Sequence, residues 1–141
     1  MDDILFPYTE QRKVQNTLIT QVKSCIENKQ NLIAHAPTGL GKTISVIAPS
    51  LAYAIKNNLT LFFLTPKHSQ HHIAIETLKL IKEKFKLDFS IVDFIGKKHM
   101  CLQQGVDLIQ NSEFYDYCKD LRKKDQCEFY SNLKNNTLKD L

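Results

Sequence analysis

The fold of this chain is constrained most by one segment, Ala36-Pro37-Thr38-Gly39-Leu40-Gly41-Lys42-Thr43. It follows an apolar run at residues 32–36 and precedes a helical pattern, so it is expected at a strand-to-helix turn. Its two glycines let successive backbone N–H groups turn toward a phosphate, and the helix that follows adds the positive end of its dipole. The segment therefore predicts a phosphate-binding loop.

Two side chains at the end of the loop carry the chemistry. Lys42 is expected to reach the β- and γ-phosphates, and the hydroxyl of Thr43 is expected to complete the shell of a Mg²⁺ ion. The predicted cofactors are thus ATP and Mg²⁺. The cradle itself is assigned to Ala36, Pro37, Thr38, Gly39, Leu40 and Gly41.

Size and composition narrow the class of protein. A chain of 141 residues with 43% hydrophobic content can form a compact domain with its own core. The formal charge of +4 permits a nucleic-acid partner without requiring one. No stretch approaches the roughly twenty apolar residues that span a bilayer, and the acidic start is unlike a signal peptide. We therefore expect a cytoplasmic protein with no membrane partner.

Helical and apolar segments alternate through the first two thirds of the chain. Helices are expected at residues 11–28, 42–56 and 69–85, and short apolar strands at residues 32–36, 60–65 and 89–95. This alternation predicts an α/β fold, a doubly wound parallel sheet with helices on both faces. Apolar spacing predicts the inward faces of the first two helices, Val14, Leu18 and Val22 in one and Ile44, Ile47, Leu51 and Ile55 in the other.

The composition of the sequence changes at Gly96. Residues 97–141 have no apolar strand and carry three of the four cysteines, Cys101, Cys118 and Cys127. Short helices are expected around residues 102–110 and 113–124. The gaps of seventeen and nine residues match neither a zinc ribbon nor a ferredoxin run, so spacing leaves open both a shared metal and unrelated half-buried thiols. Cys25 is interpreted as a core residue.

Four segments resemble the XPD-type iron–sulfur DNA helicases of superfamily 2, a resemblance that points to a prokaryotic or archaeal member. Gly96-Lys97-Lys98-His99-Met100-Cys101 resembles the opening of their iron–sulfur insertion, and residues 36–43 their motif I, with alanine in the first place. Residues 6–15 resemble the nucleotide-edge element, and residues 64–70 resemble motif Ia. The resemblance implies a RecA-like motor domain at residues 1–96 and an incomplete iron–sulfur module at residues 97–141. It also implies that Cys101, Cys118 and Cys127 ligate a [4Fe–4S] cluster.

The resemblance assigns further roles. Gln15 is expected to bond the adenine edge, and either Tyr8 or Phe6 is expected to stack on adenine or to staple the first helix. A single DNA strand is expected to meet a set of polar residues at motif Ia and the insertion, namely Thr65, Lys67, His68, Gln70, Lys97 and Lys98. A zinc site at His68, His71 and His72 is disfavoured, because no thiol or carboxylate lies beside them in the sequence.

Together these features predict the N-terminal portion of an ATP-dependent DNA helicase that translocates on single-stranded DNA and unwinds forked duplexes in DNA repair. Its repair partners are not predicted. The family's Asp-Glu-Ala-His box, its fourth cluster cysteine and its second motor domain have no counterpart here, so these residues alone are expected to hydrolyse ATP poorly or not at all. Two alternatives stay open: another P-loop enzyme such as a nucleotide kinase, and a zinc-dependent nucleic-acid-binding module without catalysis.

Overall fold

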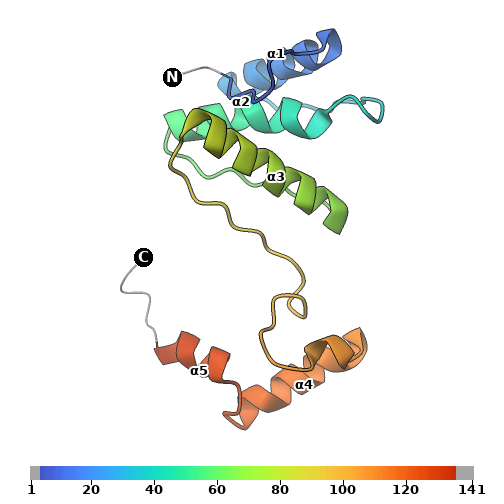
Figure 1. Ribbon diagram of the computed structural model, residues 1–141, viewed down its shortest axis with the longest axis vertical. Helices are drawn as coiled ribbons and strands as arrows, with labels where there is room; N and C mark the ends of the chain where they lie inside the picture. Colours follow the sequence, from blue (N-terminus) through green and yellow to red (C-terminus); the bar gives the residue numbers. More distant parts are fainter. Residues whose placement is uncertain (1–3, 136–141) are drawn as a thin grey trace. The chain divides into compact units, whose positions relative to one another are not determined.

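The computed structural model describes residues 4–135, and the chain divides after Asp93 into two compact units. The first unit holds three α-helices, and the second holds a short 3-10 helix and two α-helices (Figure 1). Their bounds are α1 Lys13–Glu27, α2 Lys42–Lys56, α3 His68–Phe85, the 3-10 helix Val106–Leu108, α4 Asn111–Lys123 and α5 Glu128–Asn135. No helix in the described part of the chain is long and apolar enough to cross a membrane.

Helix α2 lies between α1 and α3 and contacts both (Figure 1). It has the bounds expected from the sequence, and its predicted inward residues Ile44, Ile47 and Leu51 are buried, while Ile55 packs against the same core less completely. Ile19 of α1 and Ile81 of α3 complete this core from the two sides. The apolar spacing of α2 therefore correctly predicted residues at the centre of the first unit's core.

Helix α1 turns a different face inward from the one predicted. Val14 is 56% exposed, whereas Gln15, Leu18, Ile19 and Val22 are buried. The face is shifted by one residue because the amide of Gln15 finds hydrogen-bond partners where it is buried, which removes the usual cost of burying a polar side chain. The prediction for Val14 is wrong, and those for Leu18 and Val22 are confirmed.

The ends of helices α1 to α4 share one geometry. A non-glycine residue with φ of 50 to 55° follows each helix, at Lys29, Asn58, Lys86 and Asp125. At the end of α1 the N–H of the next residue donates to the carbonyl five residues back, Gln30 to Cys25 at 2.8 Å, and the same bond ends the other three helices. This arrangement satisfies carbonyls that the helix leaves unpaired. Each helix is thus closed by its own backbone.

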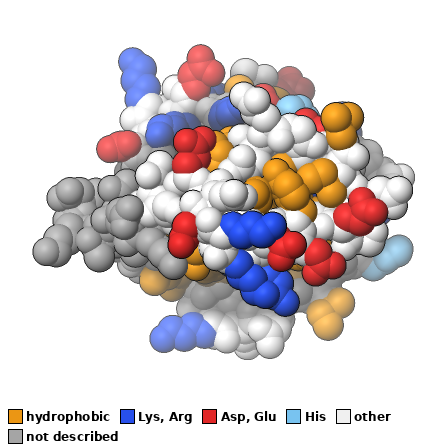
Figure 2. Space-filling model, turned by 90° about the horizontal axis from the view of Figure 1, so that it is seen from below, with side chains coloured by type: hydrophobic (Ala, Val, Ile, Leu, Met, Phe, Trp, Pro, Cys, Tyr) orange, Lys and Arg blue, Asp and Glu red, His pale blue; other side chains and the backbone are white. Residues whose placement is uncertain are grey.

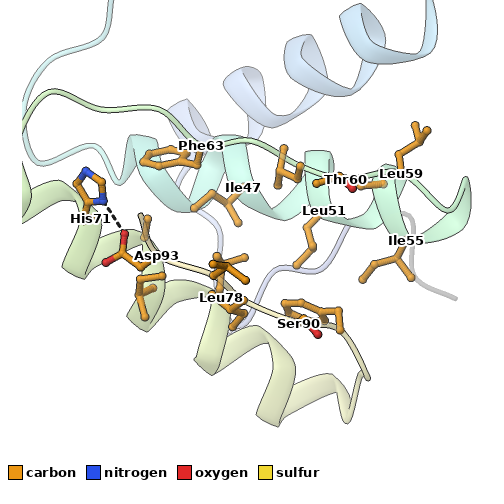
Figure 3. Close-up of a pocket in the computed structure, with 17 residues that line it drawn as sticks. Ile47, Leu51, Ile55, Leu59, Thr60, Phe63, His71, Leu78, Ser90 and Asp93 are labelled. Carbon is orange, nitrogen blue, oxygen red and sulfur yellow. Dashed lines mark hydrogen bonds and ion pairs between the residues drawn. The ribbon is translucent and has the colours of Figure 1, made fainter. Parts of the chain in front are cut away.

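The segments expected as strands do not form a sheet in the described residues, which contain no β-strand. Residues 59–63 and 89–93 lie beside α2 and α3 around an apolar cavity of about 440 Å³ (Figure 3). Several apolar side chains of the three expected strands are largely exposed, among them Ile33, Phe62 and Leu64. A strand needs a neighbouring strand for its backbone hydrogen bonds. The parallel sheet therefore stays a prediction.

The second unit has a small core of its own, in which Phe114 of α4 and Val106 are buried. The guanidinium of Arg122 lies 5.2 Å from the centre of the Tyr130 ring, which links α4 to α5. The helix predicted at residues 102–110 is wrong except for the 3-10 turn Val106–Leu108, and α5 was not predicted. Gly105, whose φ of 77° lies in the left-handed region, interrupts the helix expected there.

Candidate nucleotide site

The phosphate loop joins residue 36 to the start of α2, and its two glycines have different reasons to be glycine. Gly39 and Gly41 have φ of 80° and 83°, values that other residues adopt at a cost. A Cβ on Gly41 would lie 2.4 Å from Nε2 of Gln15, whereas a Cβ on Gly39 would meet nothing within 4 Å. Gly41 is thus required by a close neighbour, and Gly39 borders open space.

Lys42 is folded back over its own loop. Its ammonium donates to the carbonyls of Ala36 at 3.1 Å and Pro37 at 2.7 Å, and the side chain is exposed. Thr43 is half-buried in the first turn of α2. The ammonium must exchange these two carbonyls for phosphate oxygens when a nucleotide binds, a replacement of neutral acceptors by charged ones that favours the bound state.

The start of α1 is bonded directly to the loop. Gln15 donates from Nε2 to the carbonyl of Leu40 at 2.9 Å, and its Oε1 accepts from the backbone N–H of Arg12 at 2.9 Å. Arg12 donates from Nη1 to the carbonyl of Gly39 at 3.1 Å. A primary amide has two N–H donors and two acceptor lone pairs, so Gln15 keeps one of each for a ligand. That is the pair of groups an adenine edge requires.

A cavity of about 260 Å³ lies beside these bonds, between the N-terminal segment and the loop. Its lining residues are Phe6, Tyr8, Glu10, Arg12, Gln15, Gly39 and Gly41. Phe6 is buried in the core, whereas Tyr8 is 53% exposed and meets Phe6 edge-on at 5.7 Å between ring centres. Of the two rings proposed from sequence, Tyr8 is thus the one free to stack on a base. Glu10 and Arg12 were missed, although Arg12 belongs to the element that suggested Gln15.

The residues expected to contact DNA in the first unit gather at the start of α3. The hydroxyl of Thr65 is hydrogen-bonded to the side-chain oxygen of Gln70, and the N–H of Lys67 lies 3.4 Å from the same hydroxyl. The Lys67 side chain is exposed. The side chain of His68 lies outside the described part of the structure. Thr65, Lys67 and Gln70 are therefore brought together, and the charged side chain of Lys67 faces solvent.

The other histidines near α3 do not build a metal site. Nδ1 of His71 lies 2.7 Å from Oδ1 of Asp93, a contact visible at one end of the larger cavity in Figure 3. No group of three or more His, Cys, Asp or Glu side chains suited to a metal ion occurs among the described residues. His71 thus fastens residue 93 to α3.

In the second unit the predicted lysines differ in exposure. Lys97 is exposed, whereas the ammonium of Lys98 donates to the carbonyl of Ile109. On the face shown in Figure 2, Lys and Arg side chains are interspersed with Asp and Glu around apolar side chains. Charge on that face therefore does not by itself mark a path for DNA.

The three cysteines of the second unit are free thiols and are half-buried. Their soft donor atoms suit an iron–sulfur cluster or zinc. The positions of the three cysteines do not suit such a site, because the described residues contain no set of three candidate metal ligands close enough to share an ion. Cys25, interpreted as core, is also only half-buried.

The comparisons with known proteins give the family. The DEAD_2 family matches residues 63–141, which is more than half of the chain. The chain belongs to the DEAD_2 family. A probable ATP-dependent helicase of Methanocaldococcus jannaschii is 34% identical over 101 residues, which are 71% of this chain and 15% of that protein. No solved structure matches the chain.

Two further relatives are more distant. A regulator of telomere elongation helicase 1 homologue of Anopheles gambiae is 24% identical, and the 3′-5′ exonuclease DinG of Bacillus subtilis is 26% identical. Each match takes in 77% of this chain and 12% of the relative. This DEAD_2 chain thus spans 12 to 15% of the length of these curated relatives. Family and relatives together support a helicase of superfamily 2.

Proposed function

We propose that this DEAD_2 chain is the N-terminal portion of an ATP-dependent DNA helicase and that its first unit binds the nucleotide. The observation that carries the proposal is the direct bonding of α1 to the phosphate loop, where Gln15 and Arg12 hold the carbonyls of Leu40 and Gly39 beside a cavity. A loop for phosphates, an amide with one donor and one acceptor to spare, and an exposed tyrosine meet at one place. This set suits a purine nucleotide.

Binding follows from these contacts. The base enters the cavity against Tyr8 and the remaining groups of Gln15, and the phosphates lie on the open side of Gly39. Lys42 then leaves its two carbonyls for the phosphate oxygens, and Thr43 would hold the Mg²⁺ that shields their charge. In the helicases that the sequence resembles, an Asp-Glu-Ala-His box supplies the carboxylates that activate the attacking water, and residues 1–141 contain no such box.

The DNA-contacting part of the proposal rests on the start of α3. Thr65, Lys67 and Gln70 present hydroxyl, ammonium and amide groups at one helix end, and such groups bind the phosphate backbone without reading sequence. We propose that this end binds a single DNA strand at a fork, and we propose separately that Lys97 and Lys98 of the second unit contact DNA. In the complete helicase, closure of two motor domains on ATP would move that strand and unwind a duplex, as DNA repair requires.

Two finer assignments belong to the same proposal. The apolar segments at residues 32–36, 60–65 and 89–95 are proposed as strands of a RecA-like parallel sheet. Their exposed apolar side chains support this, and so does the position of residues 60–63 and 89–93 around the apolar cavity. A [4Fe–4S] cluster at Cys101, Cys118 and Cys127 is supported by donor chemistry alone and requires that these thiols move together. Iron and sulfide analysis of the anaerobically purified protein tests the cluster, and zinc in its place would contradict it.

The nucleotide site is tested by titration of the protein with ADP and Mg²⁺. Lys42→Ala is expected to weaken binding at least about tenfold, because it removes a charged phosphate contact without touching the core. Lys13→Ala, which removes an exposed lysine from the first turn of α1, is the control and should bind as the unchanged protein does. Equal affinity of the Lys42 variant would contradict the proposed site.

A further inference from the structure

Four carbonyls at residues 36–40 of the phosphate loop accept hydrogen bonds from side chains. Lys42 takes those of Ala36 and Pro37, Gln15 takes that of Leu40, and Arg12 takes that of Gly39. The first two bonds come from the loop's own helix and must break when Lys42 turns to a phosphate. The other two come from α1 and can persist in the nucleotide-bound state.

The two persistent bonds act on loop residues that differ in their surroundings. Around Gly41 the loop is crowded, since Nε2 of Gln15 lies 2.4 Å from the place of a Cβ and the residue caps α2. Around Gly39 no atom lies within 4 Å of the place of a Cβ. Packing therefore fixes Gly41, whereas a side-chain hydrogen bond from Arg12 holds Gly39. The residue most in need of support is thus the one that Arg12 supports.

Arg12 is itself held at the backbone. Its N–H donates to Oε1 of Gln15 at 2.9 Å, and it stands at the N-cap of α1, which is packed on α2. Its guanidinium donates from Nη1 to the carbonyl of Gly39 at 3.1 Å. The side chain therefore spans the distance between a fixed helix end and a loosely surrounded loop residue.

We infer that Arg12 is a positioning residue for the phosphate loop: it holds the Gly39 carbonyl so that the loop N–H groups are directed at the phosphates before a nucleotide arrives. The inference rests on the proposed nucleotide site and adds to it a residue that acts through the loop and not on the base. Pre-ordering of this kind favours binding because the free energy of ordering the loop is spent before the ligand binds.

The test separates the loop from the base cavity by the choice of ligand. Inorganic triphosphate uses the loop alone, adenosine uses the cavity alone, and ADP uses both. Arg12→Ala is expected to weaken triphosphate and ADP binding by about tenfold and to leave adenosine binding unchanged. Arg12→Lys keeps a donor of similar reach and should recover part of the affinity. Lys13→Ala removes an equal charge one residue away and controls for long-range electrostatics.

Each other outcome is decisive. Loss of adenosine binding in Arg12→Ala would make Arg12 a base contact and overturn the inference, as would unchanged affinity for all three ligands. If Arg12→Ala has a lower melting temperature, Arg12→Lys is compared at a temperature where both variants are folded by circular dichroism. If the unchanged protein bound neither ADP nor triphosphate, the proposed function itself would fail. Binding that Lys42→Ala weakens and Arg12→Ala does not would refute only the role of Arg12.

Discussion

Two apolar parts of the first unit differ in burial. Along α2 the apolar side chains are buried, and Ile47 keeps 1% of its surface exposed. In the segments expected as strands, Ile33 is 99% and Leu64 is 87% exposed. Both regions were predicted from their apolar residues, α2 from helical spacing and the strands from short apolar runs.

The difference shows what each kind of element needs from the rest of the molecule. A helix closes its hydrogen bonds within its own segment, so α2 forms and then needs only α1 and α3 to cover its apolar face. A strand takes its hydrogen bonds from a neighbour, and a sheet buries its side chains only when both faces are covered. The proposed nucleotide site lies between the start of α1 and the start of α2, and its hydrogen bonds do not involve the expected strands.

The largest expected effect contrasts Ile47 with Ile33. Ile47→Ala should lower the free energy of unfolding by about 2–5 kcal/mol, because it opens a cavity in the core. Ile33→Ala should change it by less than about 0.5 kcal/mol, because no core surrounds that side chain. Urea denaturation followed by circular dichroism measures both. A large loss for Ile33→Ala would show that residues 32–36 are covered in solution and would break the contrast.

A second comparison lies within the phosphate loop. Gly41→Ala and Gly39→Ala should each lose about 1–2 kcal/mol from a positive φ. Gly41→Ala should lose about 1 kcal/mol more, because its Cβ displaces Gln15 from the carbonyl of Leu40. Thermal unfolding of the two variants tests this order. Equal losses would mean that Gln15 moves aside at no cost.

A third comparison concerns the bonds that fasten residue 89 to α3. Lys82 donates to the carbonyl of Phe89 at 2.7 Å, and its ammonium lies 5.5 Å from the centre of the Phe89 ring. Lys82→Ala should therefore cost about 1 kcal/mol. Lys79→Ala, on the exposed side of α3, should leave the melting temperature unchanged. If both variants melted alike, residues 89–93 would be held by their neighbours and not by Lys82.

The smallest expected effect is electrostatic. A hydrogen bond from Lys79, and then its charge, hold the pKa of Glu76 below its ordinary value. A lowered pKa in the folded state gives stability that is present at neutral pH and is lost as the pH falls through that pKa. Lys79→Ala should raise the pKa of Glu76, as measured by NMR titration, with little effect on stability because both groups are exposed. An unchanged pKa of Glu76 would show that Lys79 and Glu76 do not interact in solution.

The sequence-based expectations were accurate where the interactions lie within one segment and inaccurate where they join residues far apart in the sequence. The bounds of α2 agree with the expectation because spacing and turn residues lie within the segment itself. The choice of Gln15 over Val14 for the buried face of α1 was missed, because it depends on Leu40, 25 residues away. The helix expected at residues 102–110 was wrong because Gly105, with φ of 77°, and the extended backbone at Ile109 limit the helical part to one 3-10 turn.

The sequence by itself predicted a phosphate-binding loop, and it determined the three helices of the first unit and the DEAD_2 family to which the chain belongs. These depend on short-range chemistry: φ values that glycine allows, and hydrogen bonds that a helix makes within itself. The tertiary structure alone decided that Tyr8 and not Phe6 is free to stack, and that Arg12 holds Gly39. Arg12 and Gly39 are 27 residues apart, and their contact exists because the packing of α1 on α2 brings a helix end to a loop.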